Sequence, residues 1–160
     1  MNLSYKFTEA QPDALFVPPL SYPVNLSTIQ DLPLTASGVD VHLSVGEVAR
    51  LLERHPDWPG VILTAQGRFV GLLTRRACSE FLGNMLGTRI FSEVSIFAFF
   101  KKYGAGGLIL DGGVSVEGAV RAARDDRQGD AVHDPIVVCQ GQCQYGLLDM
   151  PVLLKAQAIL

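Results

Sequence analysis

The sequence predicts an α/β fold of the α+β kind, made of two β-α-β-β-α units behind an extended N-terminal arm. Three segments recur in the same order, which indicates a duplicated unit. The pairs are 44–49 (SVGEVA) with 115–120 (SVEGAV), 61–63 (VIL) with 136–138 (IVV), and 71–73 (GLL) with 146–148 (GLL). The offset grows from 71 to 75 residues, and the four extra residues fall between 124 and 135. A polar loop tolerates such an insertion.

Composition supports a folded chain and narrows its partners. Of the 160 residues 48% are hydrophobic and 18% charged, which favours a packed core over disorder. The net charge of −3 excludes a basic nucleic-acid footprint over the whole chain. No apolar run approaches the roughly 20 residues of a membrane span, and the first residues show no basic segment followed by an apolar one, so we expect no signal peptide. We therefore expect a cytoplasmic protein with no nucleic-acid or membrane partner.

Residues 1–38 form the predicted arm. Five of the nine prolines lie there, which disfavours long helices and central strands. The segment also carries Leu15, Phe16, Val17 and Leu20, and a disordered tail would be more polar. We expect an extended arm that packs onto the body of the protein.

Residues 39–88 form the first repeat. Alternation predicts a strand at 39–43, and Ser44 with Glu47 matches a capping box that begins a helix with an apolar stripe. His55-Pro56 ends that helix. Strands follow at 61–63 and 69–73, around a turn at Gln66-Gly67, and a second helix covers 75–82.

Residues 89–106 link the repeats, and residues 107–160 form the second repeat. Its elements are strand 108–110, helix 116–124 begun by Ser115, strands 136–139 and 144–148, and a last helix from Met150. The linker has four phenylalanines within 90–100. They belong either to the core or to a dimer face.

Cysteines and histidines give no sign of a metal site or of catalysis. Cys78, Cys139 and Cys143 show no CxxC spacing, and the three histidines lie far apart in sequence. Cys139 and Cys143 flank a predicted hairpin tip, either as ordinary strand side chains or as a regulated disulfide. No nucleophile–base or paired-carboxylate pattern is visible, so we expect no enzyme, no catalytic residue and no metal.

The order of these elements, with S-V at each helix start and G-L-L before the second helix, resembles a tandem pair of cystathionine-β-synthase (CBS) domains. The resemblance covers roughly residues 39–158. It implies that the two units pack about a pseudo-twofold axis with two clefts between them. Members of the family bind AMP, ATP, S-adenosylmethionine or cyclic dinucleotides in these clefts, and signal to a fused or separate output domain. The resemblance also implies a homodimer.

The family motif at the end of the third strand is G-h-x-[T/S]-x-x-D, whose carboxylate suits a ribose. The first repeat keeps the hydroxyl as Thr74 but has Ala77 at the carboxylate position. The second repeat has Asp149 and Val152 at these two positions. Thr74 and Asp149 also suit helix capping.

Arg75 and Arg76 stand near a helix N-terminus, where amides and guanidinium groups together favour an anion. They are either phosphate contacts or solvated surface arginines. The predicted ligand-binding residues are Thr74, Arg75, Arg76, Val61, Ile62, Leu43, Ser44 and Asp149.

Two functions follow. The first is a regulatory module that binds an adenine nucleotide or related anionic ligand between the repeats, as the arginines favour. The alternative is a ligand-free pair that serves dimerisation or protein docking, as the absent carboxylates favour. The apolar last helix, 152–160, predicts continuation into an output domain.

Overall fold

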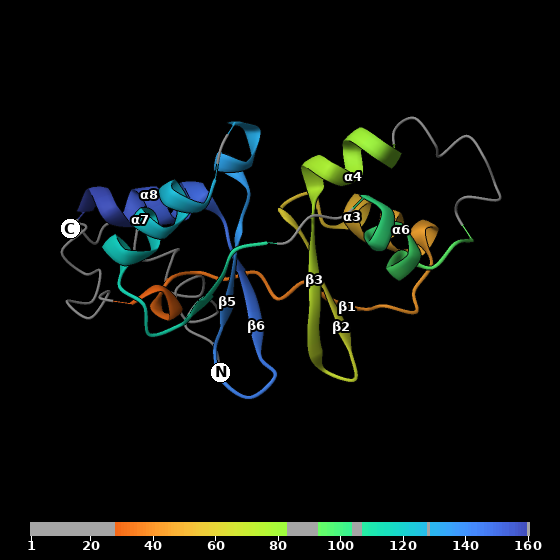
Figure 1. Ribbon diagram of the computed structural model, residues 1–160, viewed down its shortest axis with the longest axis horizontal. Coiled ribbons are helices and arrows are strands. Elements are labelled where there is room, and N and C mark those ends of the chain that lie inside the picture. The colour runs from red at the N-terminus through yellow and green to blue at the C-terminus, as the bar shows by residue number, and fades with distance from the viewer. Residues whose placement is uncertain (1–27, 83–92, 104–106, 128, 160) are drawn as a thin grey trace.

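The computed structural model describes residues 28–82, 93–103, 107–127 and 129–159. Two three-stranded sheets lie beside each other, and helices cover each of them (Figure 1). The elements in chain order are η2 (Ile29–Asp31), β1 (Gly38–Asp40), α3 (Val45–Arg54), β2 (Gly60–Ala65), β3 (Arg68–Thr74), α4 (Arg75–Leu82), α6 (Ile96–Tyr103), β4 (Ile109–Asp111), α7 (Val116–Asp126), η3 (Gly129–His133), β5 (Ile136–Cys139), β6 (Tyr145–Leu148) and α8 (Met150–Ile159). The predicted α+β class is confirmed. Most of the predicted arm, residues 1–27, lies outside the described residues.

The two sheets have the same topology, as expected of a duplication. In each, the first strand runs parallel to the second, and the second pairs antiparallel with the third. Ser44 begins α3 with a complete capping box: its Oγ accepts from the Glu47 amide at 3.1 Å, and Glu47 accepts from the Ser44 amide at 2.8 Å. This second bond lowers the pKa of Glu47. Ser115 begins α7 by accepting from the Gly118 amide at 3.0 Å.

The strand predicted at 39–43 is shorter in the structure and ends at Asp40. The Asp40 carboxylate accepts a hydrogen bond from the His42 amide at 2.8 Å, and the main-chain carbonyl of Asp40 accepts one from the Leu43 amide at 3.1 Å. An aspartate that binds the backbone two residues ahead favours a turn over a strand. The His42 amide is also the main reason why the pKa of Asp40 is lowered.

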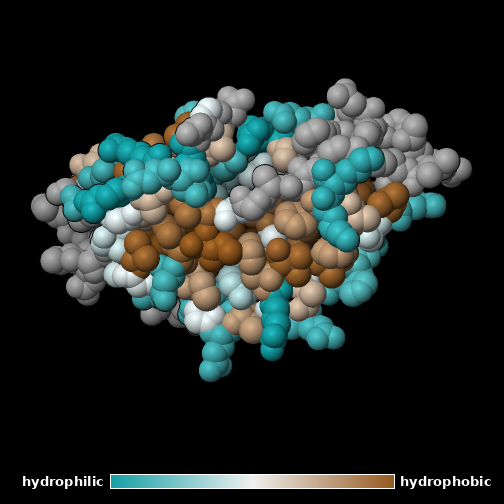
Figure 2. Space-filling model, in the orientation of Figure 1, coloured by the Kyte–Doolittle hydropathy of each residue, from teal (hydrophilic) through white to brown (hydrophobic). Residues whose placement is uncertain are grey.

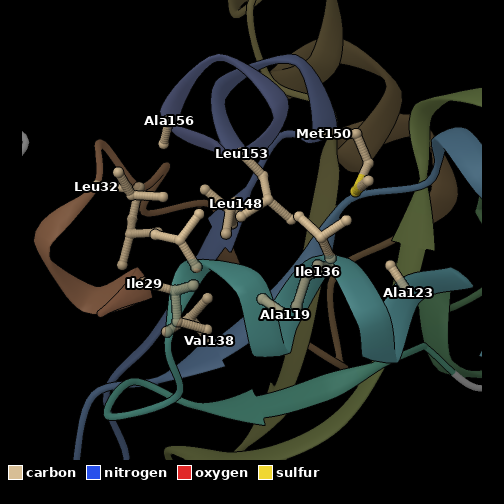
Figure 3. Close-up of a cluster of buried hydrophobic side chains, with 13 residues drawn as sticks. Ile29, Leu32, Ala119, Ala123, Ile136, Val138, Leu148, Met150, Leu153 and Ala156 are labelled. Carbon is tan, nitrogen blue, oxygen red and sulfur yellow. The ribbon is translucent and has the colours of Figure 1, made fainter. Parts of the chain in front are cut away.

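The core of the second repeat contains side chains that come before the first repeat in the sequence. Ile29, Leu32 and Leu34 are buried against α7, α8 and the second sheet. Figure 3 shows Ile29 and Leu32 among Ala119, Leu148 and Leu153 and their neighbours. The chain then leaves this core and enters the first sheet as β1.

The reciprocal arrangement holds for the first repeat. Ile96 and Phe99 of α6, which precede the second repeat, are buried against α3 and the first sheet. Phe100 packs partly on the same core, whereas Phe97 is exposed. The core interpretation of the linker phenylalanines is thus right for Phe99, and Phe91 lies outside the described residues.

Residues 29–34 and 96–99 are thus exchanged segments, each packed on the repeat that it does not directly precede. Matching backbone hydrogen bonds hold both of them. The amides of Ile29 and Gln30 donate to Val114 and Gly112 carbonyls at 2.9 and 3.1 Å. The amides of Ile96 and Phe97 donate to Leu43 and Val41 carbonyls at 2.7 and 3.3 Å. The two sets occupy equivalent places in the repeats, which gives the pair its pseudo-twofold symmetry.

The crossing of the chain from one repeat to the other joins the two sheets. Thr35 exchanges two 2.8 Å backbone bonds with Leu147 of β6, and two residues later the Ser37 carbonyl accepts from the Ile62 amide of β2 at 3.0 Å. Ile62 and Leu72 pack there against Val137 and Leu147. On the surface, Figure 2 shows hydrophobic residues gathered across the middle of the face that is turned to the viewer, over both halves of the molecule.

We expect Ile96→Ala to destabilise the whole chain although it lies in the segment between the repeats. Its side chain is fully buried in the first core, and truncation of a buried isoleucine costs about 2–5 kcal/mol. Phe97→Ala, on the same helix but exposed, is the control and should cost far less. Urea unfolding followed by circular dichroism measures both, and equal midpoints for the two variants would contradict this packing.

Candidate functional site

Thr74 ends β3 and begins α4. Its Oγ1 accepts a hydrogen bond from the Ala77 amide at 3.0 Å, and the side chain is nearly buried. The hydroxyl therefore caps the helix, as one of the two sequence-based interpretations proposed. The neighbouring strand approaches closely here, because a Cβ on Gly60 would meet the Leu73 carbonyl oxygen at 2.5 Å.

Arg75 turns away from the second repeat and fixes the loop before β2. Its Nε donates to the Trp58 carbonyl at 2.6 Å, and its Nη2 donates to the His55 and Leu52 carbonyls at 2.6 and 3.1 Å. His55 and Trp58 stack with ring centroids 4.1 Å apart. The guanidinium thus satisfies carbonyls at the C-terminal end of α3, where cations are favoured.

Arg76 extends across the boundary between the repeats. Its Nε and Nη2 lie 3.2 and 3.0 Å from Oδ1 and Oδ2 of Asp134, which precedes β5. A two-point guanidinium–carboxylate contact of this kind fixes the relative orientation of the two groups. The Arg76 side chain is 40% exposed and that of Asp134 is 19% exposed. A weaker contact joins Arg76 to Glu80 at 3.6 Å within α4.

Arg127 supports Asp134 from the other side. This arginine follows α7 and is buried, and it donates to the carbonyls of Asp134 and Pro135, the latter at 2.8 Å. Burial is the main reason why its pKa is lowered. A buried charge is tolerated when its donors are paired in this way. Arg127 does for the loop before β5 what Arg75 does for the loop before β2.

The other predicted site residues pack in the core or take part in backbone hydrogen bonds and helix caps. Val61 lies in the first core, and Ile62 lies between the repeats. The Leu43 carbonyl binds the Ile96 amide, and Ser44 caps α3. The Asp149 carbonyl begins α8 by accepting from the amides of residues 152 and 153 at 3.1 and 3.2 Å.

The sequence analysis missed Asp134 and Arg127. Asp134 is 58 positions from the arginine it binds, and it lies in the loop where the repeats differ in length. The second-repeat carboxylate that meets Arg76 is therefore Asp134, and not Asp149, which stands at the hydroxyl position of the family motif.

All three cysteines of the chain are free thiols in the structure. Cys78 is buried in the first core, and burial raises its pKa to about 11, which disfavours a reactive thiolate. Cys139 and Cys143 are unpaired thiols in the second hairpin. Within the part of the chain that the structure describes, no three His, Cys, Asp or Glu side chains gather as metal ligands, and none of the helices could cross a bilayer.

No protein-family model matches the sequence, and no curated protein matches it closely enough to indicate a relative. Solved structures do match the fold. A CBS-domain protein from Agrobacterium tumefaciens superposes with a TM-score of 0.61 at 14% identity, over 85% of this chain and 97% of that one. The CBS domain of a bacterial CNNM/CorC-family Mg²⁺ transporter, in complex with an inhibitor, gives 0.61 at 9% identity, over 96% and 93%.

A third structure, Hypoxic Response Protein I with two coordinated zinc ions, gives a TM-score of 0.58 at 14% identity, over 81% of this chain and 98% of that one. At such low identity the likeness concerns the fold alone. The duplicated β-α-β-β-α units, their reciprocal packing and these superpositions agree, and the chain is a tandem CBS pair in its fold.

Proposed function

We propose that this chain is a regulatory CBS pair that binds an anionic ligand, an adenine nucleotide or a related compound, between its repeats and signals to a fused or separate output domain. The observation that carries the proposal is the Arg76–Asp134 contact, which spans the two repeats beside the N-terminus of α4. A ligand that binds there engages a side chain that contacts the other repeat.

Arg76, rather than Arg75, is the ligand arginine of this proposal. The Arg75 guanidinium already donates to three carbonyls, and moving it would leave them unpaired. Arg76 is more exposed, and its partner is a side chain that can turn toward solvent. The first amides of α4 add favourable partial charge for a phosphate.

The absent carboxylates define the ligand class further. With Ala77 and Val152 at the two ribose positions, recognition depends on the anionic part of the ligand. ATP, AMP and cyclic dinucleotides carry phosphates that suit a guanidinium fork, whereas S-adenosylmethionine offers one carboxylate and a cationic sulfonium. We rank phosphate ligands first for this reason.

A ligand regulates only if it binds two arrangements of the pair with different affinities. Thr74, Arg75 and Arg76 belong to the first repeat, and Asp134 and Arg127 belong to the second. A ligand anion that engages Arg76 changes the polar contact between the repeats, while the backbone pairing at Thr35 and Ser37 stays in place. The proposed signal is therefore a small adjustment of one repeat against the other.

The proposed homodimer uses α8. Its exposed side chains are Pro151, Leu154, Lys155, Ala158 and Ile159, which follow a helical stripe and are apolar except for the lysine. The equivalent stripe of α4 carries Arg76, Ser79 and Glu80. An apolar face of this kind, on a helix whose other side is buried, favours an interface.

The alternative is a ligand-free docking pair. It is favoured by the fact that both arginines already bind groups of the chain itself. The two functions differ in one measurable property, which is nucleotide binding by the wild-type chain.

We predict that a phosphate-containing nucleotide raises the melting temperature and that Arg76→Ala abolishes this shift. A ligand at about 100 times its Kd stabilises a fold by about 2.7 kcal/mol, which is several degrees for a chain of this size. The control is Arg50→Ala, an exposed arginine on α3. Absence of any shift with AMP, ATP, S-adenosylmethionine and cyclic dinucleotides would leave the docking alternative.

The two adjacent arginines should affect stability very differently. Arg75→Ala leaves three carbonyls without their donor, and we expect a loss of about 2–3 kcal/mol in the free energy of unfolding. Arg75→Lys should recover little, because an ammonium lacks the planar fork. Arg76→Ala removes a partly exposed ion pair and should cost less than about 1 kcal/mol. Urea unfolding of all three variants decides this, and the reverse order would refute the assignment.

Light scattering after size exclusion should show a dimer that Leu154→Glu dissociates. A carboxylate placed at this position, now 46% exposed, would be buried in the interface without a partner. Phe97→Glu changes an exposed apolar side chain on α6 instead, and it should leave the dimer intact. Dissociation by Phe97→Glu alone would move the interface to α6, and a monomeric wild type at high micromolar concentration would remove the homodimer.

A further inference from the structure

We infer that Asp134 is an internal counterion that occupies the anion site at Arg76 and has to be displaced before a ligand anion binds. The inference rests on the proposed function and adds the regulation of that same site. The observations behind it are the paired geometry of the contact, the way in which the Asp134 main chain is held, and the position of the two residues in different repeats.

The Asp134 carboxylate binds Arg76 as a ligand phosphate would. Two guanidinium nitrogens face the two carboxylate oxygens at 3.2 and 3.0 Å. Phosphate oxygens take the same donors in the same fork geometry. An incoming anion and Asp134 therefore compete for one set of donors, and binding of one excludes the other.

The main chain of Asp134 is held by hydrogen bonds that do not involve its own side chain. Arg127 donates to the carbonyls of Asp134 and Pro135, and the Asp134 amide donates to the Ala131 carbonyl at 3.0 Å. Among the described contacts, the hydrogen-bond partner of the carboxylate is Arg76, and its charge also favours the charged form of the buried Arg127 guanidinium. Displacement thus requires rotation of one side chain that is already 19% exposed, while the loop before β5 stays in place.

Competition of this kind has a defined consequence for affinity. The apparent Kd for an anion equals the intrinsic Kd divided by the fraction of molecules in which Arg76 is unoccupied. The factor depends on the internal pair and not on the ligand, so it should be similar for different anions. Displacement also removes a side-chain contact between the repeats, which couples ligand binding to their arrangement.

The experiment compares ATP and inorganic pyrophosphate binding by isothermal titration calorimetry at constant ionic strength, since screening alters such contacts. The variants are Asp134→Asn, Asp134→Ala, Arg76→Ala and the double variant Arg76→Ala/Asp134→Asn. Glu117→Gln removes the same charge near the start of α7, about 15 Å along that helix from Arg127, and serves as the control. Circular dichroism verifies folding, and the two Asp134 variants substitute for each other if one fails to fold.

The expected result is that Asp134→Asn and Asp134→Ala tighten binding of both probes by a similar factor, roughly three- to fivefold, as expected for loss of a pair worth less than about 1 kcal/mol. Glu117→Gln should stay within about twofold of wild type. In the Arg76→Ala background Asp134→Asn should produce no gain, because the donors for which it competes are gone.

Three results would overturn the inference. Wild-type binding that Asp134 variants leave unchanged would reject the counterion and leave the proposed function standing. An equal gain with and without Arg76 would show general charge repulsion in place of competition. Absence of binding in both the wild type and the Asp134 variants would reject the proposed function, and the inference with it.

Discussion

Each of the two cores in this chain is closed by side chains that precede the other repeat. Ile29 completes the second core and Ile96 the first, and both are fully buried. Burial of one such side chain contributes about 1.5–3 kcal/mol, so neither core keeps its packing without the exchanged segment. The chain between them crosses from sheet to sheet with paired backbone at Thr35 and Ser37. The repeats are therefore one cooperative structure and not two independent modules on a linker.

This constraint decides where the pair can adjust. The apolar contacts between the sheets are buried, and the chain that crosses between them is hydrogen-bonded to both sheets at Thr35 and Ser37. Changing this boundary would disrupt close-packed side chains. The Arg76–Asp134 contact lies at the edge of that boundary and is partly exposed, so it is worth less than about 1 kcal/mol. In the proposed function, a ligand anion replaces this weak contact while the boundary stays packed. The proposed regulation depends on this difference between a rigid boundary and a weak polar link across it.

Much of the fold follows from local sequence. The capping box at Ser44 and Glu47 begins α3 as predicted, and the predicted helix at 75–82 agrees with α4 at both ends. The strand predicted at 39–43 ends at Asp40 in the structure. The alternation of apolar and polar residues carries no information about the hydrogen bond from the His42 amide to the Asp40 side chain, which favours a turn there. The exchanged segments were not predictable. Apart from a shared isoleucine, η2 and the start of α6 have little sequence in common, since each needs only apolar side chains at the right depth.

The candidate site was predicted only in part. Arg75 and Arg76 are adjacent and chemically identical in sequence, yet one lies over the carbonyls that end α3 and the other faces the second repeat. Helix geometry separates neighbouring side chains by about 100°, so the surroundings decide their roles. Asp134 had no local signal, because its partner is brought to it by the packing of the two repeats.

Native-state hydrogen exchange tests whether the repeats form one cooperative unit through the exchanged segments. The amides to follow are those of Ile29 and Ile96, which hydrogen-bond to the opposite repeat, and those of Ile62 and Val137 in the two central strands. We expect all four amides to exchange only through global unfolding, with the same opening free energy. Exchange of Ile29 or Ile96 through a local opening of lower free energy, or different free energies for Ile62 and Val137, would contradict it.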